Sequence, residues 1–189
     1  MREQRRHQRI RFNHPPCVRI GQGGKAGRGE LENLSLGGLM LRTDLSLVVG
    51  AVLGCEFSVL DSSSIDLAAV VVSKVGDCYG TRFQLGPISA SLIEQAIEQA
   101  LASGKASILS INEREGRKTM RIGGGLNACL RSDFMHGLTR VGVDEMDLSA
   151  VTGMDRDGLE LCRIAVEQYR VALIQPSPCV ASGLAGYIL

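Results

Sequence analysis

The feature that most constrains the fold is a regular alternation of apolar and polar residues, which fills the first half of the chain and then stops. It runs through segments such as "CVRIGQGGKAGRGELENLS" and "CYGTRFQL", which are separated by Gly-rich turns. A period of two places alternate side chains on opposite faces of a β-strand, with one face buried. Five or six short strands of this kind predict a small antiparallel β-barrel.

The pattern changes at Pro87, after which apolar residues recur at helical spacing until Gly104. Proline is favoured in the first turn of a helix and glycine just beyond its end. The segment therefore predicts a capped amphipathic helix that closes the first unit. Its expected buried face is formed by Ile88, Leu92, Ile93, Ala96, Ile97, Ala100 and Leu101.

Beyond this helix, strand-like and helix-like segments alternate, which is the order of an α/β fold. We expect a boundary near residues 103–106, and thus two domains, 1–104 and 105–189. The three glycines 123–125 are interpreted as a turn at a strand end. The expected strands are 106–113, 118–125, 142–151 and 171–175, and the expected helices are 127–140 and 157–170.

The composition of the 189 residues, 44% hydrophobic and 22% charged, suits a soluble chain of one or two domains. No apolar run approaches the ~20 residues of a membrane helix, and the arginine-rich start lacks the apolar stretch of a signal peptide. We therefore expect a cytoplasmic protein. The six cysteines have no C-x-x-C spacing, so we expect reduced, mostly packed thiols and no zinc site.

The charge is unevenly distributed, although the formal net charge is only +1. Residues 1–28 contain eight Arg or Lys and one acidic residue, whereas the remainder contains 13 basic and 19 acidic residues. A basic arm of this kind can hold phosphate, nucleic acid or an acidic membrane surface, because each of these is polyanionic. It can also be a solvated tail.

The arm and a later turn carry complementary polar groups. The arm contains Arg5, Arg6 and Arg9 within "RRHQR". A guanidinium group is planar and permanently charged, so it can fork onto a phosphate or onto the O6/N7 edge of guanine, and it can also stack on a base. The turn "NLSLGG" offers the amide of Asn33, the hydroxyl of Ser35 and the close backbone approach that glycine permits. Together these groups predict a cradle for a guanine nucleotide.

An R-x-x-x-R arm followed by D/N-x-S-x-x-G on a small β-barrel resembles the PilZ domain family, over residues 3–103. The stretch "YGTRFQL" also resembles the last strand of that family, and the helix after it resembles the family's usual ending. The resemblance implies a domain that binds cyclic di-GMP, a bacterial second messenger. It implies Arg5 and Arg9 on guanine and phosphate with Arg6 in the same arm, Asn33 and Ser35 on the other base, and Gly38 closing the turn.

Two alternatives from other classes remain open: a nucleic-acid-binding regulator that uses the basic arm, and a ligand-independent scaffold. An aromatic content of 4% with no Trp disfavours base stacking on a single strand. His7 and His14 are interpreted as surface or neighbouring positions, because no second metal-type residue has a suitable spacing. We therefore expect neither a metal nor a cofactor.

The second domain contains "VDEMDLSAVTGMDRDGLELC", in which a buried strand runs through a turn directly into an amphipathic helix. This stretch and the earlier "IGGGLNACLRSDFMHGL" resemble STAS domains, over residues 105–189. The resemblance implies an α/β domain that contacts a protein partner. It also implies a regulatory turn at Asp155, Asp157 and Gly158.

Where regulated STAS proteins carry a phosphorylatable Ser before the Gly, this chain has Asp157. A carboxylate there can cap the first helical turn but cannot accept phosphate from a Ser kinase. We interpret Asp157 as a helix cap, and a permanent imitation of the phosphorylated state is the alternative. Thr152 and Ser149 are the nearby hydroxyl residues that phosphorylation would have to use.

No enzyme signature is found in the sequence. It has no paired His and nucleophile and no P-loop, since "RIGGGLNA" lacks the G-x-x-x-x-G-K-S/T spacing. The predicted protein is a sensor and not an enzyme. Its barrel would bind cyclic di-GMP, and its second domain would pass the signal to a protein partner.

Overall fold

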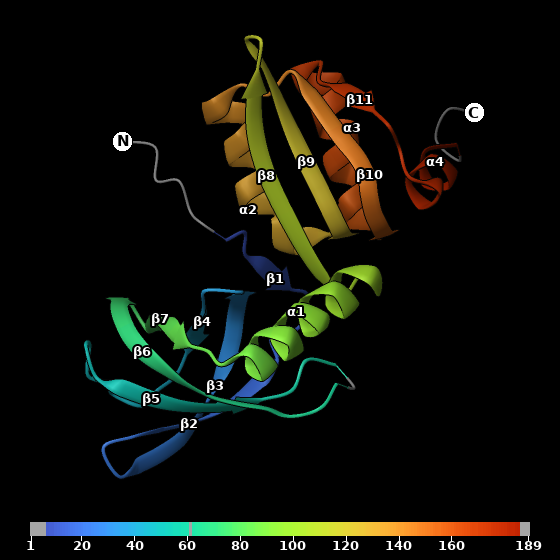
Figure 1. Cartoon of the computed structure of the whole chain (residues 1–189). Helices are drawn as coiled ribbons and strands as arrows, with labels where there is room; N and C mark the ends of the chain where they lie inside the picture. The colour runs from blue at the N-terminus through green and yellow to red at the C-terminus, as the bar shows by residue number, and fades with distance from the viewer. Residues whose placement is uncertain (1–6, 61, 186–189) are drawn as a thin grey trace. The chain divides into compact units, whose positions relative to one another are not determined.

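The structure is a computed structural model that describes residues 7–60 and 62–185. The chain divides into two compact units, Met1–Ala100 and Leu101–Leu189. The first unit is built mostly of strands, and the second mixes strands with helices (Figure 1). None of the described helices combines the length and the apolar character that crossing a membrane requires.

Antiparallel strands form the first unit, as the alternating pattern predicted. Six of them follow one another in the order β3–β2–β5–β6–β7–β4, and β3 also pairs with β4, which closes the barrel. A short additional strand, β1, pairs with β3 and was not predicted. The strands are β1 (Ile10–Phe12), β2 (Cys17–Gln22), β3 (Lys25–Ser35), β4 (Gly38–Arg42), β5 (Val52–Phe57), β6 (Ile65–Val75) and β7 (Cys78–Gln84).

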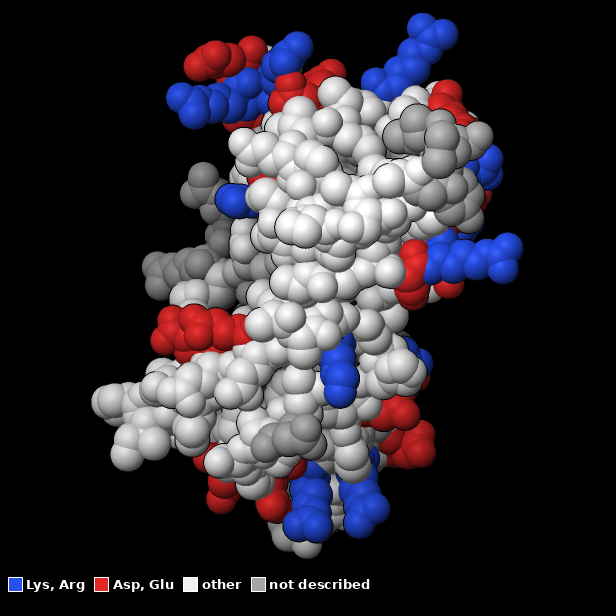
Figure 2. Space-filling model, turned by 90° about the vertical axis from the view of Figure 1, so that its right-hand side faces the viewer, with Lys and Arg blue, Asp and Glu red and all other residues white. Residues whose placement is uncertain are grey.

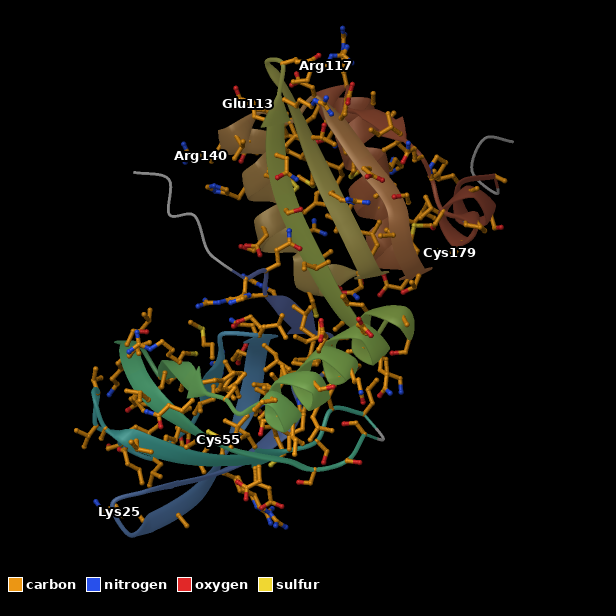
Figure 3. All side chains as sticks on the ribbon, in the orientation of Figure 1. Lys25, Cys55, Glu113, Arg117, Arg140 and Cys179 are labelled. Atoms are coloured by element: carbon orange, nitrogen blue, oxygen red, sulfur yellow. The ribbon has the colours of Figure 1, made fainter. Side chains whose placement is uncertain are left out.

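The apolar half of each strand fills the barrel. Val18, Leu31, Leu41 and Leu53 are completely buried, and burial of such side chains is the main favourable term in folding. Cys55 of β5 also lies inside the barrel (Figure 3), and burial raises the pKa of its thiol to about 12. This thiol is therefore a packing group rather than a reactive one.

Helix α1 (Pro87–Ala102) follows β7 and confirms the predicted helix. Ile93, Ala96 and Ala100 are buried, in agreement with the predicted apolar face. Gly104, just beyond the end, has a φ of 69°, a left-handed conformation that glycine adopts readily. Ile88 was placed on the buried face wrongly, since its side chain is 79% exposed. Five residues turn a helix about 140° past one full turn, so Ile88 faces away from Ile93.

The second unit has the predicted α/β order. Its sheet has the strand order β11–β10–β9–β8, with β8 antiparallel to β9 and with β9, β10 and β11 parallel. Helices α2 and α3 lie behind this sheet in the view of Figure 1. The elements are β8 (Ala106–Arg114), β9 (Arg117–Leu126), the 3₁₀ turn η1 (Ala128–Leu130), α2 (Arg131–His136), the π-helical turn η2 (Gly137–Val141), β10 (Glu145–Met154), α3 (Arg156–Tyr169), β11 (Ala172–Ile174) and α4 (Pro178–Ala185).

The core of this unit lies between the sheet and the helices. Met120 and Ile122 of β9 are fully buried together with Phe134 of α2 and Leu161 of α3. Cys162 is buried in the same cluster, and burial raises the pKa of its thiol to about 11. Each unit thus has an apolar core of its own, which is what two separate domains require.

Three segments differ from the predictions. The glycines 123–125 lie inside β9 and not in a turn. Glycine is needed there for another reason, since a side chain at Gly124 would collide with the carbonyl oxygen of Ala106 in the neighbouring strand. The expected helix 127–140 is divided into η1, α2 and η2, and Asn127 starts it by accepting a hydrogen bond from the amide of Cys129 at 2.9 Å. Helix α4 was not predicted, and it lies against β10.

Candidate functional site

The turn between β3 and β4 is held by its own polar groups and by strand β7. Ser35 is 4% exposed, and its hydroxyl donates a hydrogen bond to the carbonyl oxygen of Gly38 at 3.0 Å. The carbonyl oxygen of Gly37 accepts one from the amide of Phe83 at 3.0 Å. A Cβ atom at Gly38 would collide with the carbonyl oxygen of Thr81, so this position requires glycine.

Strand β1 brings the basic arm to this turn. It pairs antiparallel with the end of β3, with Arg11 opposite Asn33. Arg9, two residues earlier in the chain, therefore lies beside Ser35. Ile10, between the two arginines, is 1% exposed and anchors this part of the arm in the barrel core. A three-residue strand thus determines where the arm meets the turn.

A pocket of about 240 Å³ lies where the arm and the turn meet. Three of the predicted site residues, Arg9, Ser35 and Gly38, line it together. Arg5 and Arg6 lie outside the described residues. The pocket is lined by His7, Arg9, Ser35, Gly37, Gly38, Val72, Thr81 and Arg82.

Asn33 does not line this pocket, although it lies on the same strand face as Ser35. Its Oδ1 atom is buried and has no hydrogen-bond partner among the described residues. A buried oxygen without a partner costs about 1–3 kcal/mol. The end of β3 therefore contains an acceptor that the rest of the described chain leaves unsatisfied.

Five lining residues were not among the predicted site residues, and one of them, Gly37, lies in the predicted turn itself. His7 was set aside as a neighbouring position, but its ring lies over Gly37, where an added Cβ would come within 3.0 Å of the imidazole Cδ2. Val72, Thr81 and Arg82 come from β6 and β7. The stretch "YGTRFQL" indicated the strand that contains Thr81 and Arg82, but the sequence does not show which strand lies beside it.

Two arginines elsewhere on the barrel, Arg19 and Arg42, have acidic partners. Arg42 of β4 contacts Glu32 at 2.8 Å and Asp77 at 2.9 Å. The hydrogen bond from Arg42 to Glu32 and the charge of Glu32 raise the pKa of Arg42. On the face of the molecule drawn in Figure 2, basic and acidic side chains are interspersed. The surface in that view therefore has no broad area of a single charge.

The turn before α3 satisfies its polar groups internally. Asp155 is the N-cap, and its Oδ1 accepts a hydrogen bond from the amide of Gly158 at 2.8 Å. The interpretation of Asp157 as the cap is wrong. The amide of Gly158, in the first helical turn, has no partner within the helix, and it is bonded by the side chain of Asp155 three positions earlier. Asp157 is exposed within that first turn, where its charge complements the helix dipole. A Cβ atom at Gly158 would collide with the carbonyl oxygen of Leu126.

A groove of about 660 Å³ runs along α3 in the second unit. Thr152, on the strand that leads to this helix, is exposed, and its hydroxyl donates a hydrogen bond to the carbonyl oxygen of Leu101. Within residues 7–60 and 62–185, no group of three His, Cys, Asp or Glu side chains is placed to hold a metal ion. The groove is lined by Arg156, Asp157, Leu159, Glu160, Cys162, Arg163, Val166, Glu167, Leu173 and Leu184.

Comparison with known families assigns the first unit. Residues 3–103, more than half of the chain, match the PilZ domain. The chain therefore belongs to the PilZ domain family, which confirms the resemblance inferred from the arm and the turn. No match is found among curated proteins.

Several solved structures are similar to the barrel. The Bacillus subtilis inhibitor of motility MotI/DgrA is 19% identical with a TM-score of 0.43, over 52% of this chain and 52% of that chain. The PilZ domain with c-di-GMP of YcgR from Escherichia coli is 20% identical with a TM-score of 0.41, over 52% of this chain and 98% of that chain. The K. pneumonia MrkH–c-di-GMP complex is 20% identical with a TM-score of 0.45, over 52% of each chain. The matched part is about half of the MotI and MrkH chains.

Proposed function

We propose that the chain is a receptor for cyclic di-GMP and that the pocket between the arm and the β3–β4 turn is its binding site. The observation that carries the proposal is the meeting of Arg9 with Ser35 and Gly38 in one pocket of about 240 Å³. Membership of the PilZ domain family supports the same ligand. Arg5 and Arg6 precede Arg9 in the arm, and we propose them as further contacts.

The polar groups at the site suit the chemistry of this ligand. A guanidinium group such as that of Arg9 can fork onto a phosphate or onto the O6/N7 edge of a guanine. The unsatisfied Oδ1 of Asn33 can accept a hydrogen bond from the N–H groups on the other edge of a guanine. Gly38 lets the backbone of the turn approach the ligand without a side chain between them.

Calorimetry on the full chain tests this proposal. We expect cyclic di-GMP to bind and GTP to bind poorly, because the site has to satisfy two guanines and two phosphates together. Arg9→Ala should weaken binding about tenfold or more, since a charge-assisted hydrogen bond contributes about 1.5–3 kcal/mol. Unchanged affinity in Arg9→Ala would refute this site. A gel shift with duplex DNA but no heat with cyclic di-GMP would favour the nucleic-acid alternative.

We further propose that the second unit is a STAS-like domain that passes the signal to a protein partner. The support is its chain order, two antiparallel strands followed by alternating helices and parallel strands, and the direct passage from β10 through a short turn into α3. The groove along α3 borders this turn at Arg156 and Asp157. We propose Asp155, Asp157 and Gly158 as the turn that shapes the partner surface.

Two measurements test this second part. Affinity purification from the native cells, with and without cyclic di-GMP, should recover a partner whose amount depends on the ligand. Asp157→Ser should weaken or change that capture, because it removes the exposed charge beside the groove. Substantial phosphate on Thr152 or Ser149 in protein from the same cells would contradict a docking surface that is controlled only by the ligand.

A further inference from the structure

One wall of the pocket is formed by Thr81 and Arg82 of strand β7, which belongs neither to the arm nor to the turn. Strand β4 pairs with β7 so that Met40 lies opposite Gly80. Following this antiparallel register back to the start of β4 places Gly38 level with Arg82. A Cβ atom added at Gly38 would lie 3.3 Å from the Cα atom of Arg82, which confirms how close the two backbones are.

Arg82 differs from Arg19 and Arg42, the two barrel arginines with acidic partners, in its surroundings. Its side chain is exposed, and it forms no hydrogen bond or ion pair with any described residue. Arg42 on the adjacent strand has two acidic partners, and Arg19 contacts Glu56 at 3.3 Å. The charge of Arg82 is therefore not neutralised by the described chain, and it lies at a pocket that also contains Arg9.

The pocket residues near Arg82, Thr81 and Val72, carry no charge that could bind an anionic ligand. Thr81 is 5% exposed, and its hydroxyl already accepts from the amide of Leu39 at 3.3 Å and donates to the carbonyl oxygen of Leu39 at 3.2 Å. Val72 sits at an irregularity of β6, is 46% exposed, and gives the pocket an apolar side. Among the residues that the structure describes, none with an acidic side chain lines this pocket.

We infer that Arg82 is a further ligand-binding arginine, which contacts a phosphate or a guanine edge of cyclic di-GMP from the side opposite the arm. This inference rests on the proposed function of the pocket. It adds a contact that neither the R-x-x-x-R arm nor the N-x-S-x-x-G turn contains. The ligand would then join three segments that are distant in sequence: the arm, the β3–β4 turn and β7.

The experiment is calorimetric titration of the full chain with cyclic di-GMP. Arg82→Ala should lower the affinity about tenfold, because one charge-assisted contact is lost. The matched control is Arg28→Ala, which removes an exposed arginine from β3 that does not line this pocket. The control should stay within about twofold of wild type, as expected for an isolated surface charge.

The outcomes separate this inference from the proposed function. Failure of the wild-type chain to bind cyclic di-GMP would refute the proposed function itself. Binding that is lost in Arg9→Ala but unchanged in Arg82→Ala would refute only the role of Arg82, as would an equal loss in Arg28→Ala. Thermal unfolding followed by circular dichroism should be the same for wild type and Arg82→Ala. If it is not, Arg82→Gln, which keeps most of the aliphatic stem, replaces it and should show the same loss.

Discussion

The turn after β3 and the turn after β10 share one steric requirement but differ in their polar groups. In each, a glycine is needed because a side chain would collide with a backbone carbonyl oxygen, that of Thr81 at Gly38 and that of Leu126 at Gly158. In the second turn the carboxylate has a partner within the protein, since Asp155 accepts a hydrogen bond from the amide of Gly158. The first turn borders a pocket and a buried oxygen that has no partner among the described residues.

The difference suggests a criterion for telling a ligand site from a structural turn: whether polar groups remain that have no partner within the protein. A helix cap is stable because its donors and acceptors satisfy each other. A binding site keeps groups that only the ligand satisfies, at some cost in stability. Under the proposed function, the unsatisfied Oδ1 of Asn33 and the unpaired charge of Arg82 are groups of this second kind.

The largest effects are expected from the two glycines. Gly38→Ala and Gly158→Ala should each lower the free energy of unfolding by about 1–3 kcal/mol, because each forces a Cβ against a backbone oxygen. Only Gly38→Ala should also abolish binding of cyclic di-GMP. Urea unfolding and calorimetry measure the two properties. A Gly38→Ala chain with wild-type stability and affinity would contradict the account of the first turn.

The next effects compare one polar group from each turn. Ser35→Ala and Asp155→Ala should each cost about 1 kcal/mol of stability, since each removes a hydrogen bond to a backbone group. Affinity for cyclic di-GMP should fall in Ser35→Ala and remain unchanged in Asp155→Ala. As a control for the cap, Asp157→Ala should cost less, about 0.3 kcal/mol. Equal losses in Asp155→Ala and Asp157→Ala would contradict the assignment of the cap.

A substitution of Asn33 should affect the affinity for cyclic di-GMP and the free energy of unfolding differently. Asn33→Ala should not lower the free energy of unfolding and should raise it by up to about 1–3 kcal/mol, because it removes a buried Oδ1 that has no partner among the described residues. Affinity for cyclic di-GMP should fall about fivefold, as for one lost hydrogen bond. Urea unfolding and calorimetry on the same preparation measure both. A large loss of stability with intact binding would make Asn33 a structural residue.

The smallest effect is expected from the second turn on ligand binding. Asp157→Ser changes an exposed residue in the other unit and should leave the affinity for cyclic di-GMP within about twofold of wild type. The measurement is the same calorimetric titration. A larger change would mean that the two turns are coupled.

The sequence predicted the elements that depend on local spacing. The period of two gave the barrel, and the period of α1 gave Ile93, Ala96 and Ala100 as its buried face. The arm and turn motifs indicated Arg9, Ser35 and Gly38, which the fold brings to one pocket. The barrel and the buried face of α1 were predicted correctly because each depends on residues that are close together in the chain, whereas the ligand-binding role of the motif residues stays a prediction.

The sequence did not predict the features that depend on strand register and on single helix boundaries. Arg82 reaches the turn only because β7 pairs with β4, a contact between residues about forty positions apart. The cap is Asp155 and not the predicted Asp157, because α3 begins one residue earlier than expected. Helix boundaries are harder to predict than the presence of the helix itself. The glycines 123–125 were misread because the close approach of β8 is a tertiary contact.

Hydrogen exchange of the full chain, with and without cyclic di-GMP, tests most directly whether the first turn and not the second is the ligand site. We expect slower exchange in three segments when the ligand is added: residues 7–11, the turn 33–38 and the part of β7 around Arg82. Exchange at the capped turn 154–158 should not change. Unchanged exchange at 33–38, or protection at 154–158 alone, would contradict the assignment of the first turn as the ligand site.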